Sequence, residues 1–470
     1  MAITFSEIPV AFHGKGAGAG ELTWGQMGIW RATQRNRRNM NLIWPVPLPA
    51  GTTLAEIVAR LRLMVSRHPA LRTRLRFVDG PSGDGHPQQV IAESGEVPLH
   101  IADVGDGDDP ATATEELRSR YELNWFDYEN EFPVRMGVVR QSGALLHLVV
   151  CYSHVMVDGA GLDALDQDLN HVELAAGEAA APPAGLNPLE LARKQGSPAM
   201  RRQSDRAIQH WADQLERLPA WRLKEPDPSQ APRFAELVAY SPAMELAMRA
   251  VTARTEADGT SVLLAAYAAS VARVLGRNPS VAQVVVSNRF RPGLADMVSQ
   301  VSQHGICVVD AADSSFDEVV ARAQKAVTSA SFYAYYDPVA CDRLLDEIAV
   351  RRGHPLDISW CLNDRRGRPG SADGDGEIPT GAELARVLSR TKLYWDRTSP
   401  RSDATLFLHV DTQPLMPSQQ ALDEGLPAVY MKIWADMQHF THDQIEALAR
   451  EMETVVVAAA FDVQAATSRS

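Results

Sequence analysis

The chain has 470 residues, of which 45% are hydrophobic and 22% are charged, close to the averages of globular proteins. This length exceeds the roughly 250–300 residues that a single hydrophobic core supports, so two domains are expected. The 46 Lys and Arg residues against 59 Asp and Glu residues give a net charge of −13. Because phosphate binding needs clustered basic side chains, this balance argues against a nucleic-acid partner.

The sequence carries neither a membrane segment nor a metal-binding pattern. No stretch approaches the ~20 consecutive apolar residues of a membrane-spanning helix, and the N-terminus lacks the basic-then-apolar pattern of a secretion signal. The four cysteines are far apart and form no CxxC pair, so buried reduced thiols are expected. We therefore expect a cytosolic protein with no membrane partner, no metal and no disulfide.

The first half of the chain alternates between helical and strand patterns. Residues 54–68 repeat apolar side chains at helical spacing, whereas residues 132–140 alternate with period two, as a strand does. Residues 145–152, LLHLVVCY, are almost continuously apolar, which predicts a strand covered on both faces. Helical spacing resumes at Gly159.

An Ala/Pro/Gly-rich segment at residues 178–190 is the strongest candidate for a linker. It predicts an N-terminal domain over residues 1–178 and a C-terminal domain over residues 179–470. The second half repeats the α/β mixture and contains a long polar loop at residues 365–381. Its expected helices cover residues 261–276 and 441–461, and its expected strands cover residues 281–287, 356–363, 404–411 and 428–435.

Most standard catalytic signatures are missing: there is no GxSxG, no HExxH, no Walker A motif and no GxGxxG after a strand. The glycine-rich residues 14–20 follow no buried strand, which favours a flexible loop over a phosphate-binding loop. The remaining candidate is SHVMVDG, residues 153–159, at the end of the apolar strand and before a helix. A histidine in such a place can exchange a proton near neutral pH, although a lone histidine is more often structural.

Four segments, taken in order, resemble the motifs of nonribosomal peptide synthetase condensation domains. LTWGQMGIW at residues 22–30 resembles S/T-x-x-Q-x-x-x-W, and RHPALRTRL at residues 67–75 is similar to RHxxLRT. SHVMVDG stands where that family has HHxxxDG, and residues 297–310 look like a diverged GxFVNTxxxR segment. The resemblance runs over about residues 22–461, almost the whole chain.

This resemblance implies the chloramphenicol-acetyltransferase-like α/β fold, in which two layered α+β subdomains form a V-shaped pseudo-dimer with a central tunnel. It also implies that no cofactor is bound permanently, and that peptidyl or acyl carrier proteins deliver phosphopantetheine-linked substrates in trans. Because the resemblance uses up the chain, a freestanding, monomeric protein without its own adenylation or carrier domain is expected.

The resemblance also implies roles for the residues of SHVMVDG. His154 is the expected catalytic residue, which would deprotonate or orient the nucleophile. Ser153 replaces the family's first histidine and keeps only a hydrogen-bonding hydroxyl. Asp158 is expected to be structural and paired with an arginine, since a buried carboxylate needs a cation, and a backbone N–H near Gly159 is expected to face the oxyanion. The candidate arginines are Arg67, Arg72 and Arg289.

The function that follows is a condensation-type acyltransferase, which joins a carrier-bound acyl or aminoacyl thioester to an amine or alcohol in natural-product biosynthesis. Two alternatives stay open. The HxxxDG pattern is shared with acyltransferases that use coenzyme A donors, although the DFGWG motif of the plant-type enzymes is missing. The change at Ser153 also fits an inactive module that binds carrier proteins or recruits partner enzymes, but such modules typically lose the active histidine, which is kept here.

The net charge of −13 bears on the expected partner, because carrier proteins are usually acidic too. Docking would then need a local basic or apolar patch on this protein. The one basic run, residues 31–38, reads as the solvated end of a helix and is the candidate for such a patch.

Overall fold

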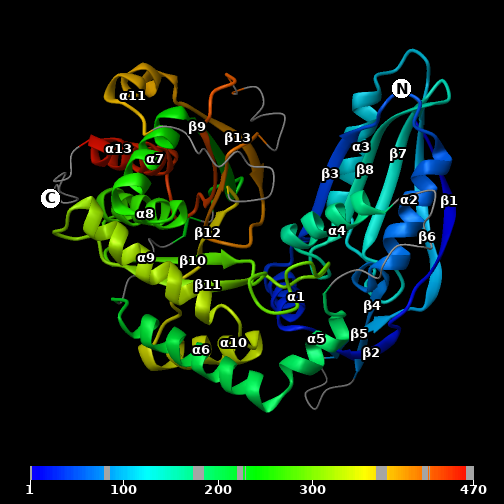
Figure 1. Ribbon diagram of the computed structural model, residues 1–470, viewed down its shortest axis with the longest axis horizontal. Coiled ribbons are helices and arrows are strands. Elements are labelled where there is room, and N and C mark those ends of the chain that lie inside the picture. The colour runs from blue at the N-terminus through cyan, green and yellow to red at the C-terminus, as the bar shows by residue number, and fades with distance from the viewer. Residues whose placement is uncertain are drawn as a thin grey trace. The chain divides into compact units, whose positions relative to one another are not determined.

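The chain folds into two compact units, shown in the computed structural model of Figure 1. The structure describes residues 3–78, 85–172, 185–219, 226–227, 229–366, 378–414, 422 and 424–461. The first unit contains residues 1–202 and 287–302, and the second contains residues 203–286 and 303–470. The boundary predicted between residues 178 and 179 lies outside the described residues, as do much of the predicted linker and most of the loop at 365–381.

The first unit is built on a five-stranded mixed sheet of order β1-β6-β7-β8-β3 and a three-stranded antiparallel sheet of order β2-β5-β4. Only β6 and β7 run parallel in the larger sheet. The strands are β1 (Thr4–His13), β2 (Gly18–Glu21), β3 (Asn41–Pro47), β4 (Thr73–Val78), β5 (His86–Ile91), β6 (Ser94–Val104), β7 (Val134–Gln141) and β8 (Ala144–Ser153). The helices are α1 (Trp24–Asn36), α2 (Leu54–Arg67), η1 (Pro69–Arg72), α3 (Pro110–Leu123), α4 (Gly159–His171) and α5 (Pro188–Gln195).

Helices cover both faces of the five-stranded sheet. On one face, α2 and α4 share a core with the strands through residues such as Leu61 and Leu165. On the other face, α3 packs through Leu117 and Tyr121 against Cys151 of β8. The side chains of β8 alternate between these two cores, which confirms the strand predicted to be covered on both faces.

The second unit contains a seven-stranded mixed sheet of order β11-β10-β12-β14-β15-β9-β13. Its strands are β9 (Phe234–Ser241), β10 (Ser280–Val286), β11 (Gln303–Val309), β12 (Trp360–Asp364), β13 (Lys392–Ser399), β14 (Leu406–Asp411) and β15 (Val429–Asp436). Its helices are most of α6 (Pro198–Glu216), then α7 (Pro242–Thr255), α8 (Gly259–Leu275), α9 (Phe316–Tyr333), α10 (Pro338–Arg352), α11 (Gly381–Val387), η3 (Leu388–Arg390) and α13 (His442–Phe461).

One face of this sheet packs against α7, α8, α9 and α13 in the largest core of the chain. Near β10 and β11 the opposite face is covered by α6 and α10, through residues such as Trp211 and Ile348. Helix α8 ends at Leu275, and the next residue, Gly276, takes the left-handed conformation at φ 64°, as a glycine after an apolar helix predicts. The second unit is thus also an α/β layered structure.

The predicted elements are confirmed in both halves, with three corrections. The strand expected from residue 356 begins only at Trp360. Residues 18–21 form β2, paired with β5, so the flexible loop expected there is wrong. The third correction is that several strands were not predicted. One of them is β3, which contains Pro45 and Pro47 and accommodates these residues, unusual in strands, as an edge strand.

The four cysteines are buried free thiols, as expected. Burial raises the pKa of Cys151 to about 12, so this thiol stays protonated at neutral pH. No helix in the described part of the chain is long and apolar enough to cross a bilayer.

Candidate active site

SHVMVDG forms a tight turn between β8 and α4. The carbonyl oxygen of Ser153 accepts hydrogen bonds from the backbone N–H groups of Met156 and Val157, at 3.0 and 3.3 Å. Val155, Met156 and Val157 are buried, so apolar packing fixes the turn as well as its backbone bonds do. His154 is half-buried at the start of the turn.

The imidazole of His154 is held by one hydrogen bond within the turn. Its Nδ1 lies 3.0 Å from the carbonyl oxygen of Val157. A carbonyl oxygen can only accept, so Nδ1 carries the hydrogen in this contact. In the neutral ring Nε2 then keeps its lone pair, and the turn presents a nitrogen that can accept a proton.

Asp158 caps α4 and also holds a distant segment of the chain. Its Oδ1 accepts hydrogen bonds from the backbone N–H of Gly161 at 2.7 Å and from the guanidinium of Arg289 at 2.6 Å. Its Oδ2 accepts from the N–H of Val301 and from the N–H and hydroxyl of Ser302, each at 2.8 Å. The residue is only 2% exposed, and these bonds satisfy both carboxylate oxygens.

These contacts make Asp158 an anchor. Burial alone would raise the pKa of Asp158, but the charge of Arg289 and the backbone N–H donors outweigh it and hold this pKa below its ordinary value. The carboxylate therefore stays ionised at neutral pH. It is also not the group that holds the imidazole of His154, whose Nδ1 is bonded to Val157.

Arg289 belongs to residues 287–302, which leave the seven-stranded sheet after β10 and rejoin it at β11. Besides Asp158, its guanidinium donates to the carbonyl oxygens of Met297 and Ser299, the latter at 2.9 Å. The chain thus wraps around a guanidinium that is 12% exposed. Of the three arginines considered from the sequence, this is the one that the structure places on Asp158.

Gly161 is the glycine on which this close packing depends. A Cβ atom there would lie 2.8 Å from the carbonyl oxygen of Ser299 and 2.9 Å from a methyl group of Val157. Gly159 is the first residue of α4, where helical spacing was expected to resume. The change of direction is made by Asp158, in extended conformation. Spacing alone did not distinguish the two glycines of DGAG.

LTWGQMGIW begins α1 and contacts the turn. Thr23 and Gln26 form a capping box, in which Thr23 Oγ1 accepts from the N–H of Gln26 at 3.2 Å and Gln26 Oε1 accepts from the N–H of Thr23 at 2.9 Å. The Gln26 amide then donates to the sulfur of Met156 at 3.5 Å, and the N–H of Gln300 donates to the Met156 carbonyl at 3.0 Å. Three of the motif segments therefore meet at Met156.

Ser153 pairs with a residue that lies outside the four motif segments. Its buried hydroxyl lies 3.2 Å from the hydroxyl of Tyr128, whose ring packs edge-on against Trp30 at 5.4 Å. Burial raises the pKa of Tyr128, and the bond to Ser153 offsets this only in part, so the phenol stays protonated. At the position where condensation domains have their first histidine, this chain has a Ser–Tyr hydroxyl pair inside the core.

Arg67 braces α4 from a different side. It ends α2, and its Nε and Nη2 donate to the two carboxylate oxygens of Asp168 in α4, at 2.8 and 2.7 Å. This bidentate pair links the two helices on one face of the sheet. RHPALRT therefore supports the helix that follows the turn, without touching Asp158.

We expect Arg67→Met to lower the free energy of unfolding by about 1–3 kcal/mol, because it removes a charge-assisted bidentate bond from a half-buried carboxylate. Urea denaturation measures this difference. The matched control is Arg60→Met, since Arg60 also joins α2 to α4, but through the exposed Asp166 at 3.5 Å. That variant should change stability by less than about 0.5 kcal/mol. Equal losses in the two variants would contradict a bracing role for Arg67.

Arg72 is buried elsewhere and also does not contact Asp158. Its guanidinium donates to the backbone carbonyls of Ala92 and Lys15. Gly14 permits this, because a Cβ atom there would lie 2.6 Å from Arg72 Nε and 2.2 Å from the carbonyl oxygen of Ser66. The glycine-rich residues 14–20 thus pack against the guanidinium of Arg72, which has a structural role.

Within the described residues, no group of three His, Cys, Asp or Glu side chains is placed to hold a metal ion. What the arrangement offers chemically is one imidazole with a fixed tautomer, beside the N-terminus of α4.

Comparison with known proteins agrees with the motifs. Residues 22–346 match the family described as "Condensation domain", and the chain belongs to that family. Its members are typically acyltransferases of nonribosomal peptide and polyketide biosynthesis, and they act on carrier-bound phosphopantetheinyl substrates.

Its relatives include large synthetases. The chain is 25% identical over 347 residues to nonribosomal peptide synthetase kk1B of Curvularia clavata, covering 71% of this chain and 3% of the synthetase. It is 25% identical over 368 residues to phosphinothricin tripeptide synthetase PhsC of Streptomyces viridochromogenes, covering 73% of this chain and 33% of that protein. The chain therefore spans no more than about a third of these relatives.

Solved structures show the same fold. The condensation domain of the Monacolin K polyketide synthase MokA superposes with a TM-score of 0.72 at 13% identity, covering 97% of this chain and all of that one. The X-domain from teicoplanin biosynthesis gives 0.67 at 20% identity, covering 95% and 96%. SgcC5 from Streptomyces globisporus gives 0.64 at 17% identity, covering 94% and 98%. The two chloramphenicol-acetyltransferase-like α/β subdomains expected from the sequence are thus confirmed.

Proposed function

We propose that this protein transfers an acyl or aminoacyl group from a phosphopantetheine thioester on a carrier protein to an amine or alcohol. The observation that carries the proposal is the fixed tautomer of His154. Its Nδ1 is committed to the carbonyl oxygen of Val157 at 3.0 Å, so Nε2 is the nitrogen available to a substrate. The proposal further rests on membership of the condensation-domain family.

In this mechanism His154 acts on the nucleophile. As the acceptor nitrogen or oxygen attacks the thioester carbonyl carbon, Nε2 accepts the proton that this atom loses. The tetrahedral oxyanion then collapses, the carbon–sulfur bond breaks, and the leaving thiolate takes up the proton. General-base help of this kind is worth ~10²–10⁴ in rate, and positioning of the tethered substrates supplies the rest.

The oxyanion needs a hydrogen-bond donor, and the N-terminus of α4 is the candidate. The N–H of Gly161 is already bonded to Asp158, and that of Leu162 is bonded to the Asp158 carbonyl. The amides of Gly159 and Ala160 precede them in the same turn, where the helix dipole also favours negative charge.

A second candidate function is a module that binds carriers or partner enzymes without catalysis. The observation in its favour is the Ser153–Tyr128 pair at the position of the family's first histidine. A solved structure of the same fold is a complex of the X-domain and OxyB from teicoplanin biosynthesis, so a domain of this fold binds a partner protein there.

The two functions are separated by product formation. The protein is supplied with acyl- and aminoacyl-loaded carrier proteins or the corresponding coenzyme A thioesters, together with amine and alcohol acceptors, and products are identified by mass spectrometry. The proposal expects amide or ester product above the enzyme-free rate with at least one carrier-bound donor. Carrier binding without product from any acceptor would favour the binding module, and product only from coenzyme A donors would overturn the carrier-dependent assignment.

For carrier docking we propose the basic run at residues 31–38, at the C-terminal end of α1. We expect Arg35→Glu/Arg37→Glu to raise KM for a carrier-bound donor about tenfold and to weaken its salt dependence, because both arginines are exposed and carriers are acidic. Turnover of the same acyl group on N-acetylcysteamine should not change. Arg351→Glu, an exposed arginine of α10, is the control. Equal KM values for this control and the double variant would rule the patch out.

A further inference from the structure

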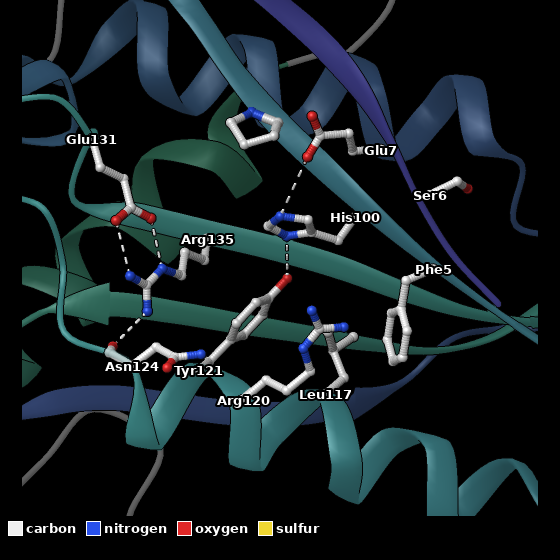
Figure 2. Close-up of a pocket in the computed structure, with 11 residues that line it drawn as sticks. Phe5, Ser6, Glu7, His100, Leu117, Arg120, Tyr121, Asn124, Glu131 and Arg135 are labelled. Carbon is white, nitrogen blue, oxygen red and sulfur yellow. Dashed lines mark hydrogen bonds and ion pairs between the residues drawn. The ribbon is translucent and has the colours of Figure 1, made fainter. Parts of the chain in front are cut away.

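A cavity of about 430 Å³ with a mixed polar and apolar lining lies in the first unit, and no residue of the SHVMVDG turn lines it. Figure 2 shows its lining, which comes from β1, β6, α3, the segment that joins α3 to β7, and the start of β7. Its volume falls within the ~300–1,000 Å³ of typical small-molecule sites.

The lining carries one cationic and one anionic side chain that form no ion pair with each other. Arg120 of α3 lies over the ring of Phe5 at 4.1 Å, and among the described residues it forms no ion pair. Glu7 of β1 places a carboxylate oxygen 3.9 Å from His100 Nε2 (Figure 2), which is beyond hydrogen-bond distance. Both Arg120 and Glu7 are exposed and accessible to a ligand.

The other charged pair in the lining neutralises itself. Arg135 donates to both carboxylate oxygens of Glu131, at 2.6 and 2.9 Å, and to the backbone carbonyls of Asn124 and Trp125. Four of its five N–H donors are therefore occupied. The four charged side chains of the lining sum to zero, which disfavours a ligand with net charge.

The floor of the cavity is fixed and mostly uncharged. The hydroxyl of Tyr121 is 2.6 Å from His100 Nδ1, and burial lowers the pKa of His100, which keeps the ring neutral at neutral pH. Gly137 lies beneath this pair, since a Cβ atom there would be 2.7 Å from both the Tyr121 oxygen and a methyl group of Leu117. Phe5 and Pro98, both half-buried, add apolar surface.

From this geometry we infer that the cavity binds a zwitterionic α-amino acid with an apolar side chain. Its carboxylate binds the guanidinium of Arg120, its ammonium group binds the carboxylate of Glu7, and its side chain packs against Phe5 and Pro98. A ligand with both charges forms an ion pair with Arg120 and another with Glu7. A simple anion or cation forms one of these ion pairs and is repelled by the other side chain.

Isothermal titration calorimetry on the full chain tests this inference with three probes of similar size. L-Phenylalanine carries both charges, 3-phenylpropionate lacks the ammonium group, and 2-phenylethylamine lacks the carboxylate. We expect L-phenylalanine to bind at least about tenfold more tightly than either analogue. Equal affinities for the three probes, or no binding of L-phenylalanine, would overturn the inference.

Two variants test which side chain binds each charge of the ligand. Arg120→Gln should weaken L-phenylalanine binding about tenfold and strengthen 2-phenylethylamine binding, because it removes the charge that repels this cation. Glu7→Gln should weaken L-phenylalanine binding equally and strengthen 3-phenylpropionate binding. The control is Arg118→Gln, on the same helix, because Arg118 is already paired with Glu115 and Glu122. Loss of binding in the control but not in Arg120→Gln would place the ligand elsewhere.

Binding in this cavity is independent of the proposed reaction. His154→Ala should bind L-phenylalanine as the wild type does, because the cavity lining does not include the turn. If His154→Ala abolished binding, the amino acid would be occupying the reaction site instead. A failure of the transferase proposal would leave the calorimetric result untouched.

Discussion

His154→Ala lowers kcat/KM for transfer from a loaded carrier by ~10²–10⁴ and leaves the melting temperature nearly unchanged, if the imidazole takes the proton of the nucleophile. The geometry explains why the substitution should lower kcat/KM but not the melting temperature. The imidazole is half-buried and makes one bond, to the carbonyl oxygen of Val157, whereas the turn is held by its own backbone bonds and by buried valines. Product formation by mass spectrometry and a thermal melt measure the two effects.

A second substitution separates proton transfer from orientation. His154→Gln retains an amide that can donate and accept hydrogen bonds but cannot take up a proton. If Nε2 works as a base, this variant is as slow as His154→Ala. If the role is only to orient the acceptor, His154→Gln recovers a large part of the rate. Turnover equal to the wild type in both variants would remove His154 from the mechanism altogether.

Asp158→Ala is expected to cost about 3–5 kcal/mol of folding free energy and to lower activity with it. The substitution leaves the guanidinium of Arg289 buried without its counter-ion, and it leaves the amides of Val301 and Ser302 without their acceptor. The activity falls because the same carboxylate caps the helix that follows His154. Denaturant unfolding and turnover are measured on the same preparation.

The control is an ion pair of similar geometry at the surface of the same unit. Asp103 and Arg140 are joined at 2.6 and 2.8 Å, but they are 38% and 33% exposed, so Asp103→Ala should cost no more than about 1 kcal/mol. Arg289→Met should resemble Asp158→Ala, and the double variant should lose less than the sum of the two. An Asp158→Ala variant as stable as Asp103→Ala would show that the buried pair contributes little.

The same pair gives a pH signature with a definite sign. The folded-state pKa of Asp158 lies below the ordinary value of ~3.9 of the unfolded chain. Its contribution to stability is therefore complete above about pH 4 and is lost as the pH falls through the folded-state pKa. Between pH 4 and the acid transition, the unfolding free energy should fall more steeply in the wild type than in Asp158→Ala.

The sequence predicted those parts of the site that depend on local pattern. The apolar run of residues 145–152 located β8 and hence the position of His154 at its end. The S/T-x-x-Q spacing of Thr23 and Gln26 is a capping box, which explains physically why those residue types begin α1. Each of these features is decided within a few residues of chain.

The remaining parts depend on contacts that no local pattern encodes. The sequence did not distinguish Arg67, Arg72 and Arg289 as ion-pair partners of Asp158. The partner is decided by which distant segment of the chain folds next to Asp158, and that segment carries Arg289. Tyr128 could not be connected with Ser153, since it lies 25 residues away in a polar segment. The donor and the acceptor of the proposed reaction could not be predicted for the same reason, because no local sequence pattern specifies them.

Residues 287–302 also set the order in which the site can form during synthesis. The acceptor and donor of the bond between Asp158 and Val301 are 143 residues apart, with β9, α7, α8 and β10 between them. At ~5–20 residues per second, a ribosome completes that interval in roughly 7–30 s. For most of this time the nascent chain holds the His154 turn without the guanidinium of Arg289, and throughout it without the amides of Val301 and Ser302 that bind Asp158. The turn therefore reaches its final geometry only after several elements of the second sheet have emerged.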